Sequence, residues 1–107
     1  MYVVIREDEV LLAEPDVFTA FHATIDPRMD RAQIVAVLDR HDVGTVSEDG
    51  THLWVRVDAV RKLAAGHVDP GWDAGLAAML TDAARKGWTS ADGREVRAHV
   101  EPSHPAG

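Results

Sequence analysis

The chain has 107 residues, of which 46% are hydrophobic and 27% charged, and its formal net charge at pH 7 is −7. These values are typical of a single globular domain, and the lack of cysteine excludes disulfides, thiolate nucleophiles and cysteine-based metal sites. The negative charge argues against nucleic acid as a partner, and no apolar run approaches the ~18 residues of a membrane span.

The first half of the chain predicts two strands and a helix. Residues 2–5 predict a short strand, and residues 17–25 predict a second strand in which two sets of side chains alternate. The pair Asp26-Pro27 then predicts a helix start. An aspartate side chain accepts hydrogen bonds from the free N–H groups of a first turn, and proline suits the first helical position. We expect this helix to end near Gly44.

The second half predicts two hairpins and two helices. An Asp-Gly pair between extended arms favours a tight turn, because glycine adopts positive φ and aspartate tolerates the bend. The first hairpin is expected at 44–57 and turns at Asp49-Gly50, and a short helix follows at 59–65. A longer helix is expected from Asp69-Pro70 to Gly87. The second hairpin, at 88–101, turns at Asp92-Gly93 and ends with the last strand.

From residue 17 onward the elements follow the β-α-β-β-α-β order of a ferredoxin-like sandwich. We therefore predict an α+β fold with an antiparallel sheet, helices on one face and an extra N-terminal strand. In that fold the first and third strands pair at the centre, and the last strand lies beside the first. The alternative is another α+β layout with a different strand order. We place one domain at 1–101 and a disordered tail at 102–107.

Alternation divides each strong strand into an apolar set and a mixed polar set. The apolar sets should face the helices, so the other sets should share the opposite face of the sheet. The side chains expected on that face are His22 and Thr24, then His52, Trp54 and Arg56, then Arg97, His99 and Glu101. Three of the six histidines are thus expected on one face.

This shared face is the candidate site. Imidazoles titrate near neutrality, so we assign His52 and His22 as acid/base candidates and Arg56 as the catalytic anion stabiliser. Trp54 would supply a flat wall for an aromatic ligand. The further expected ligand contacts are His99, Arg97 and Thr24. Three histidines also suit zinc, but the spacing matches no metal motif, so we predict no metal.

No glycine-rich phosphate loop or dinucleotide motif occurs, so we expect no cofactor. The function that these features favour is a small enzyme that binds an aromatic or carbonyl-bearing molecule and moves protons, as an isomerase, a cyclase or a monooxygenase-like enzyme. One alternative is a regulatory or interaction module that forms a homodimer through the same sheet face, with Trp54 at the contact. A third is an acidic immunity or antitoxin-like protein.

The expected compartment and source follow from two features of the sequence. The first residues lack a signal-peptide pattern, so we expect a cytoplasmic protein. The preference for arginine over lysine suggests a GC-rich bacterial genome.

Overall fold

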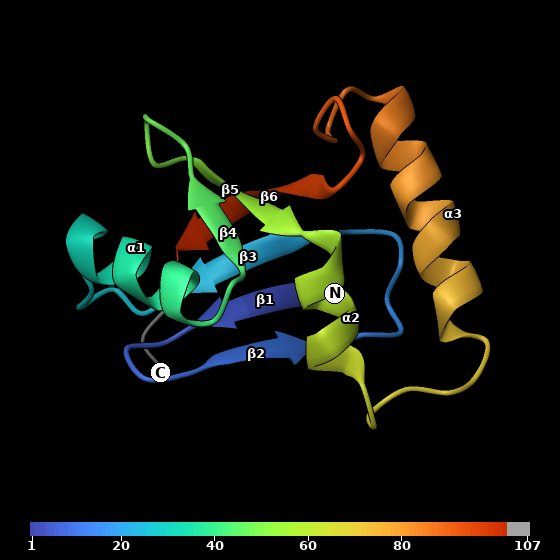
Figure 1. Cartoon of the computed structure of the whole chain (residues 1–107), viewed down its shortest axis with the longest axis horizontal. Coiled ribbons are helices and arrows are strands. Elements are labelled where there is room, and N and C mark those ends of the chain that lie inside the picture. Colours follow the sequence, from blue (N-terminus) through green and yellow to red (C-terminus); the bar gives the residue numbers. More distant parts are fainter. Residues whose placement is uncertain (103–107) are drawn as a thin grey trace.

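A computed structural model describes residues 1–102. The fold is α+β, with a curled sheet of six strands in the order β2-β1-β3-β6-β5-β4 (Figure 1). The strands are β1 (Tyr2–Ile5), β2 (Val10–Ala13), β3 (His22–Ile25), β4 (Gly44–Val46), β5 (His52–Arg56) and β6 (Glu95–Pro102). The helices are α1 (Arg31–Arg40), α2 (Val57–Ala64) and α3 (Trp72–Arg85).

The sheet is mixed, so the predicted antiparallel sheet is wrong. β3 pairs in parallel with both β1 and β6, whereas β1–β2, β5–β6 and β4–β5 are antiparallel. β6 also lies between β3 and β5, which the ferredoxin-like order would pair directly. The physical reason is the length of β6. Its eight residues allow 95–99 to pair with β5 and 99–102 to pair with β3.

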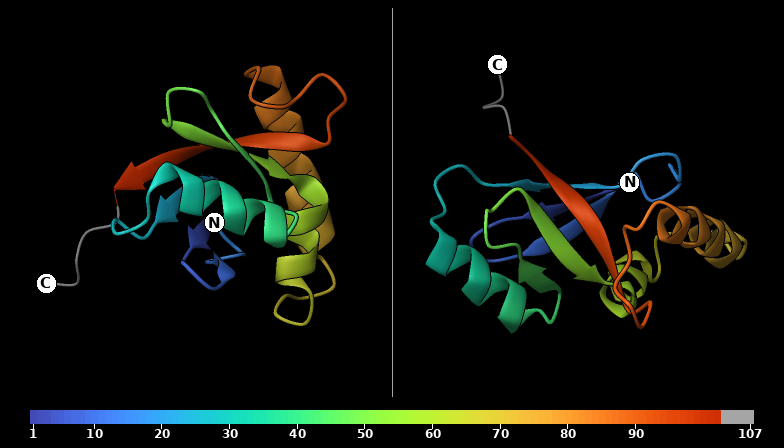
Figure 2. Two further views of the ribbon diagram at one scale, coloured as in Figure 1. Left: turned by 60° about the vertical axis from the view of Figure 1, so that its left-hand side comes forward. Right: turned by 90° about the horizontal axis from the view of Figure 1, so that it is seen from above.

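The apolar side chains of the strands face the helices, as the alternation predicts. Ala23, Leu53, Val55 and Ala98 are completely buried. Figure 2 shows α1 and α2 on the same side of the sheet, with α3 beside its end. The opposite face therefore carries the second set of side chains.

The first helix starts later than predicted. Asp30 caps α1, because its side chain accepts from the backbone of Gln33 while the Gln33 side chain accepts from the backbone of Asp30. This reciprocal pair satisfies two free N–H groups. Asp26 instead accepts from the backbone N–H of Arg28 in the preceding turn. The predicted strand at 17–25 is extended only over β3.

The second half follows the predicted order of elements, with shifted boundaries. The hairpin around Asp49-Gly50 forms β4 and β5. α2 begins at Val57, and α3 begins at Trp72 rather than at Asp69-Pro70. β6 continues through Pro102, and the rest of the predicted disordered tail, 103–107, lies outside the described residues. Among residues 1–102, no helix has the length and apolar character needed to cross a membrane.

Candidate functional site

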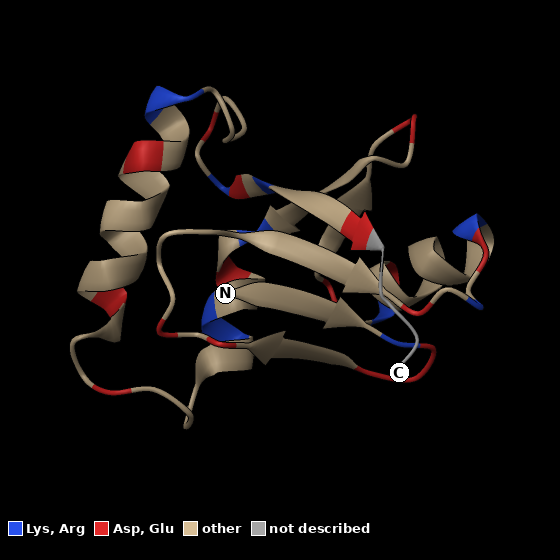
Figure 3. Cartoon of the chain, turned by 180° about the vertical axis from the view of Figure 1, so that it is seen from behind, with Lys and Arg blue, Asp and Glu red and all other residues tan. Residues whose placement is uncertain are grey.

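The sheet face turned away from α1 and α2 carries a row of three histidines. Figure 3 shows this face with no helix in front of it, and with the acidic residues mostly in the surrounding loops. His99 on β6 lies directly opposite His22 of β3 on one side and His52 of β5 on the other. Strands in a sheet lie ~4.8 Å apart, so each outer histidine is a direct cross-strand neighbour of the central one. We call these three residues the histidine row.

The backbone pairing of His52 with His99 is of the type in which the two strands approach most closely. The backbone N–H of Val100 donates to the carbonyl of Thr51 at 2.9 Å, so the His52–His99 pair itself is not hydrogen-bonded. Side chains approach most closely in such pairs. A ligand that contacts one of these rings therefore lies within reach of the other.

His22 is held between a phenol and a carboxylate. Tyr2 of β1 lies opposite His22, and the two rings stack with centroids 4.8 Å apart. The Nε2 atom of His22 lies 3.6 Å from Glu101 Oε2. Thr24 pairs with Glu101 in the next row of the same face. The side chain of His22 is 24% exposed, so it combines a fixed orientation with access from solvent.

His52 is oriented by the turn that precedes it. Its Nδ1 lies 3.0 Å from Thr51 Oγ1, and that hydroxyl lies 2.8 Å from Asp49 Oδ1. The Asp49 carboxylate also accepts from the hydroxyl of Ser47 and from the backbone N–H of Thr51. These hydrogen bonds, with Ser47 the strongest contributor, hold the pKa of Asp49 well below its usual range. The Trp54 ring meets the His52 ring edge-on, with centroids 5.9 Å apart.

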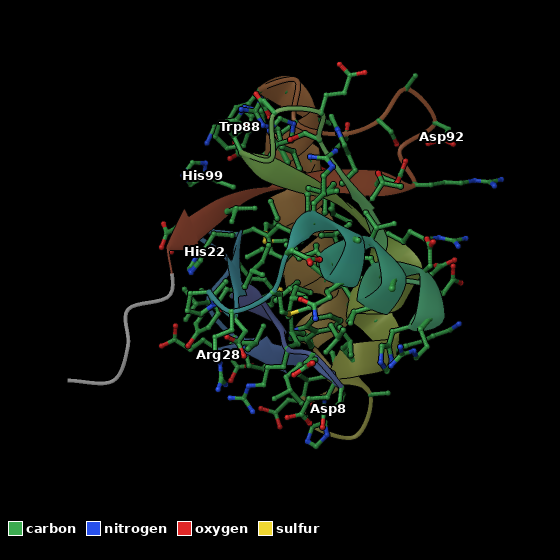
Figure 4. All side chains as sticks on the ribbon, turned by 90° about the vertical axis from the view of Figure 1, so that its left-hand side faces the viewer. Asp8, His22, Arg28, Trp88, Asp92 and His99 are labelled. Atoms are coloured by element: carbon green, nitrogen blue, oxygen red, sulfur yellow. The ribbon has the colours of Figure 1, made fainter. Side chains whose placement is uncertain are left out.

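A second row on the same face places an arginine between two tryptophans. Arg97 of β6 lies opposite Trp54 of β5. On its other side the backbone N–H of Arg97 donates to the carbonyl of Trp88 at 2.8 Å, next to the antiparallel bridge between Thr89 and Val96. Directly opposite residues share a face, so Trp54, Arg97 and Trp88 form one row. Figure 4 shows Trp88, His99 and His22 on one side of the molecule.

This tryptophan–arginine row is exposed and positively charged. Trp88 is 43% exposed. The Nζ atom of Lys86 lies 4.8 Å from the centroid of the Trp88 ring, which is a cation–π contact. A crevice of about 60 Å³ opens beside Trp88 and Arg97, with apolar walls from Phe18, Phe21 and Met79. Ligand pockets typically measure ~300–1,000 Å³, so the crevice suits one group of a ligand that lies across the open face.

Arg56 lies away from the histidine row. It ends β5, pairs in register with Glu95 and forms an ion pair with Asp42, which follows α1. These three residues line a pocket of about 390 Å³ at the edge of the sheet near β4. Arg56 is thus two residues further along β5 than Trp54 and has a carboxylate partner of its own.

Trp88, Lys86 and Tyr2 were not among the residues predicted for the site. The position of Trp88 could have been predicted from the sequence, because a hairpin that turns at Asp92-Gly93 places residue 88 opposite residue 97. Tyr2 joins the face only through the parallel pairing of β1 with β3, which has no local signal. Lys86 follows the end of α3.

Within residues 1–102, no three histidine, aspartate or glutamate side chains converge to hold a metal ion. Comparison with known proteins finds no protein-family model, curated protein or solved structure that matches this chain.

Proposed function

We propose that the protein is a small enzyme without an organic cofactor, which binds an aromatic or carbonyl-bearing molecule on the open sheet face and transfers protons with its histidines. The observation that carries the proposal is that the histidine row and the tryptophan–arginine row are neighbours on one face, two residues apart along β5 and β6. Imidazoles are the side chains best suited to proton transfer near neutral pH, and here they lie beside an aromatic and cationic surface.

Each side chain has a role in this proposal. Trp54 and Trp88 stack against the planar part of the ligand. Arg97 binds its carboxylate, carbonyl or enolate oxygen through paired hydrogen bonds. We assign the anion contact to Arg97 instead of Arg56, because Asp42 already neutralises Arg56. Thr24 contributes a hydroxyl at the far edge of the site.

His52 and His22 are the acid/base candidates, with His99 between them. One histidine removes a proton from the carbon next to the carbonyl group, and the electron pair of that C–H bond stays on the ligand as an enolate. The other histidine, in its protonated form, returns a proton at a different atom. Isomerisation, dehydration and cyclisation all begin with such a step, and none of them requires a redox partner.

Deuterium exchange tests this proposal without knowledge of the natural substrate. Aryl 2-keto acids and aryl ketones are incubated with the protein in D₂O, and NMR follows the loss of the hydrogen next to the carbonyl group. We expect exchange above the buffer rate with at least one compound, and a loss of about 100-fold in His52→Gln. His67→Gln is the matched control, since His67 is exposed in the connection after α2. Exchange that is absent, or equal in both variants, would refute the proposal.

A second candidate function is a homodimeric module that pairs through the same face. The exposed indole of Trp88 favours it, because large aromatic groups on an uncovered face are typical of protein interfaces. The two proposals are compatible, since two facing sheets would enclose a ligand between them. The net charge of −7 continues to disfavour nucleic acid as the partner.

A further inference from the structure

A chain of hydrogen bonds joins His52 to a carboxylate through a single hydroxyl. Thr51 Oγ1 lies 3.0 Å from His52 Nδ1 and 2.8 Å from Asp49 Oδ1. A hydroxyl group has one hydrogen to donate and can accept on its oxygen. The direction of the hydrogen bond to Asp49 therefore determines the direction of the hydrogen bond to His52.

The Asp49 carboxylate is the fixed end of this chain. Its Oδ1 atom receives the Ser47 hydroxyl at 2.7 Å, the Thr51 backbone N–H at 3.0 Å and the Thr51 hydroxyl at 2.8 Å. An ionised carboxylate only accepts hydrogen bonds, so Thr51 must donate its one hydrogen to Asp49. The Thr51 oxygen is then left to accept, and the matching donor is the N–H at Nδ1 of His52.

We propose that Thr51 and Asp49 are positioning residues that keep the proton of neutral His52 on Nδ1 and leave Nε2 as the base. This inference rests on the proposed function for its catalytic meaning. When Nε2 takes a proton from the ligand, the N–H bond forms as the C–H bond breaks, and the electron pair moves into the enolate. The resulting imidazolium still donates from Nδ1 to Thr51, and the charge of Asp49 stabilises it.

The protein contains a second turn of the same sequence pattern that lacks the hydroxyl. Residues 90–95, Ser-Ala-Asp-Gly-Arg-Glu, match residues 47–52, Ser-Glu-Asp-Gly-Thr-His. In the second turn Ser90 donates to Asp92 at 2.7 Å, and the backbone N–H of Arg94 donates to Asp92 at 3.0 Å. In both turns, therefore, the aspartate accepts from the serine hydroxyl two residues before it and from the backbone N–H two residues after it. Arg94 occupies the position of Thr51, so the turn itself does not need a hydroxyl there.

The tautomer of His52 is measured directly by long-range ¹H–¹⁵N NMR at a pH where the ring is neutral. We expect Nδ1 to carry the proton in the wild-type protein. In Thr51→Val the backbone hydrogen bond to Asp49 is kept, and we expect the ring to shift to the Nε2–H form that free imidazole side chains favour in water. Thr51→Ser restores a hydroxyl and should restore the Nδ1–H form.

The outcomes separate this inference from the proposed function. A wild-type ring protonated on Nε2, or an Nδ1–H form that persists in Thr51→Val, would overturn the inference whatever the activity. The expected tautomers together with no deuterium exchange would leave the inference standing and refute the proposed enzyme. Backbone amide spectra of Thr51→Val, compared with those of Thr51→Ser, show whether the turn is intact.

Discussion

His52 and His99 lie directly opposite each other on β5 and β6, in a pair without hydrogen bonds between its own backbone groups. In such a pair the Cβ atoms of the two residues lie as close as neighbouring strands allow. His99 has His22 as its other neighbour, so it lies between the two acid/base candidates. The proposed proton-transfer site therefore spans three strands.

The alternation of β5 and β6 predicts a sharp difference in stability between adjacent positions. Leu53→Ala removes a completely buried side chain from the core, and we expect a loss of about 2–5 kcal/mol in the free energy of unfolding. His99→Ala truncates an exposed side chain on the open face and should change that free energy by less than about 0.5 kcal/mol. Urea denaturation measures both. A comparable loss in the two variants would contradict the assigned faces.

The two Ser-x-Asp-Gly turns predict a specific response to acid. Hydrogen bonds lower the pKa of Asp49, chiefly from Ser47, and of Asp92, chiefly from the backbone of Arg94. A carboxyl whose pKa is lower in the folded state stabilises the fold above its unfolded pKa of about 4, and this stability is lost as pH falls.

We therefore expect the melting temperature to fall below about pH 4. We also expect Asp49→Asn and Asp92→Asn each to lower the melting temperature at neutral pH and to reduce its dependence on acid. Because Asp49 also accepts from the Thr51 hydroxyl, whereas Arg94 at the corresponding position of the second turn has no hydroxyl, the effect of Asp49→Asn should be the larger of the two. A wild-type acid profile retained in both variants would contradict the assignment of these carboxylates.

The position of Arg97 predicts selectivity for anionic aromatic ligands. We expect Arg97→Ala to weaken the binding of naphthalene-2-carboxylate at least about tenfold, because a hydrogen bond to a charged group contributes about 1.5–3 kcal/mol. Arg97→Lys should recover only part of this loss, since lysine lacks the paired donors. Fluorescence titration measures the affinity, and Arg94→Ala in the second turn is the control. Equal weakening toward neutral naphthalene-2-methanol would contradict a charge-based role.

Trp88 tests whether the open face is also a dimer interface. If two copies pair through this face, Trp88→Ala should raise the dimer dissociation constant at least about tenfold, as expected for a buried interface tryptophan. Light scattering after gel filtration measures the mass. Val35→Ala on α1 is the control, because Val35 is 39% exposed but lies on a helix that covers the other face of the sheet. Dissociation in Val35→Ala alone would place the interface on the helical side.

The face of each strand was predictable from the sequence, because side chains alternate with a period of two. That rule places Leu53 in the core, and His52 and Trp54 on the opposite face, without knowledge of the strand order. The start of α1 was harder, because Asp26 and Asp30 both resemble caps. The deciding partner was Gln33, three residues after Asp30.

The strand order was predictable only in part. The predicted direct pairing of β3 with β5 is wrong, because β6 is long enough to pair with both of them, whereas the predicted pairing of β6 with β3 occurs. The histidine row depends on that pairing, since β6 brings His99 between His22 and His52. The ion pair of Arg56 was not predictable either. Its partner Asp42 is placed by the end of α1, and no local pattern predicts the contact.

The most direct test of a ligand site on this face is an NMR map of where an aromatic carboxylate binds. The protein's three tryptophans supply the contrast. The indole N–H signals of Trp54 and Trp88 should shift as naphthalene-2-carboxylate is added, together with the ring signals of His52 and His99. The signal of Trp72 should stay in place, because its Nε1 donates to the carbonyl of Pro15 at 2.7 Å and its side chain is buried. An unchanged spectrum, or a shift of Trp72 equal to that of the other two, would contradict the site.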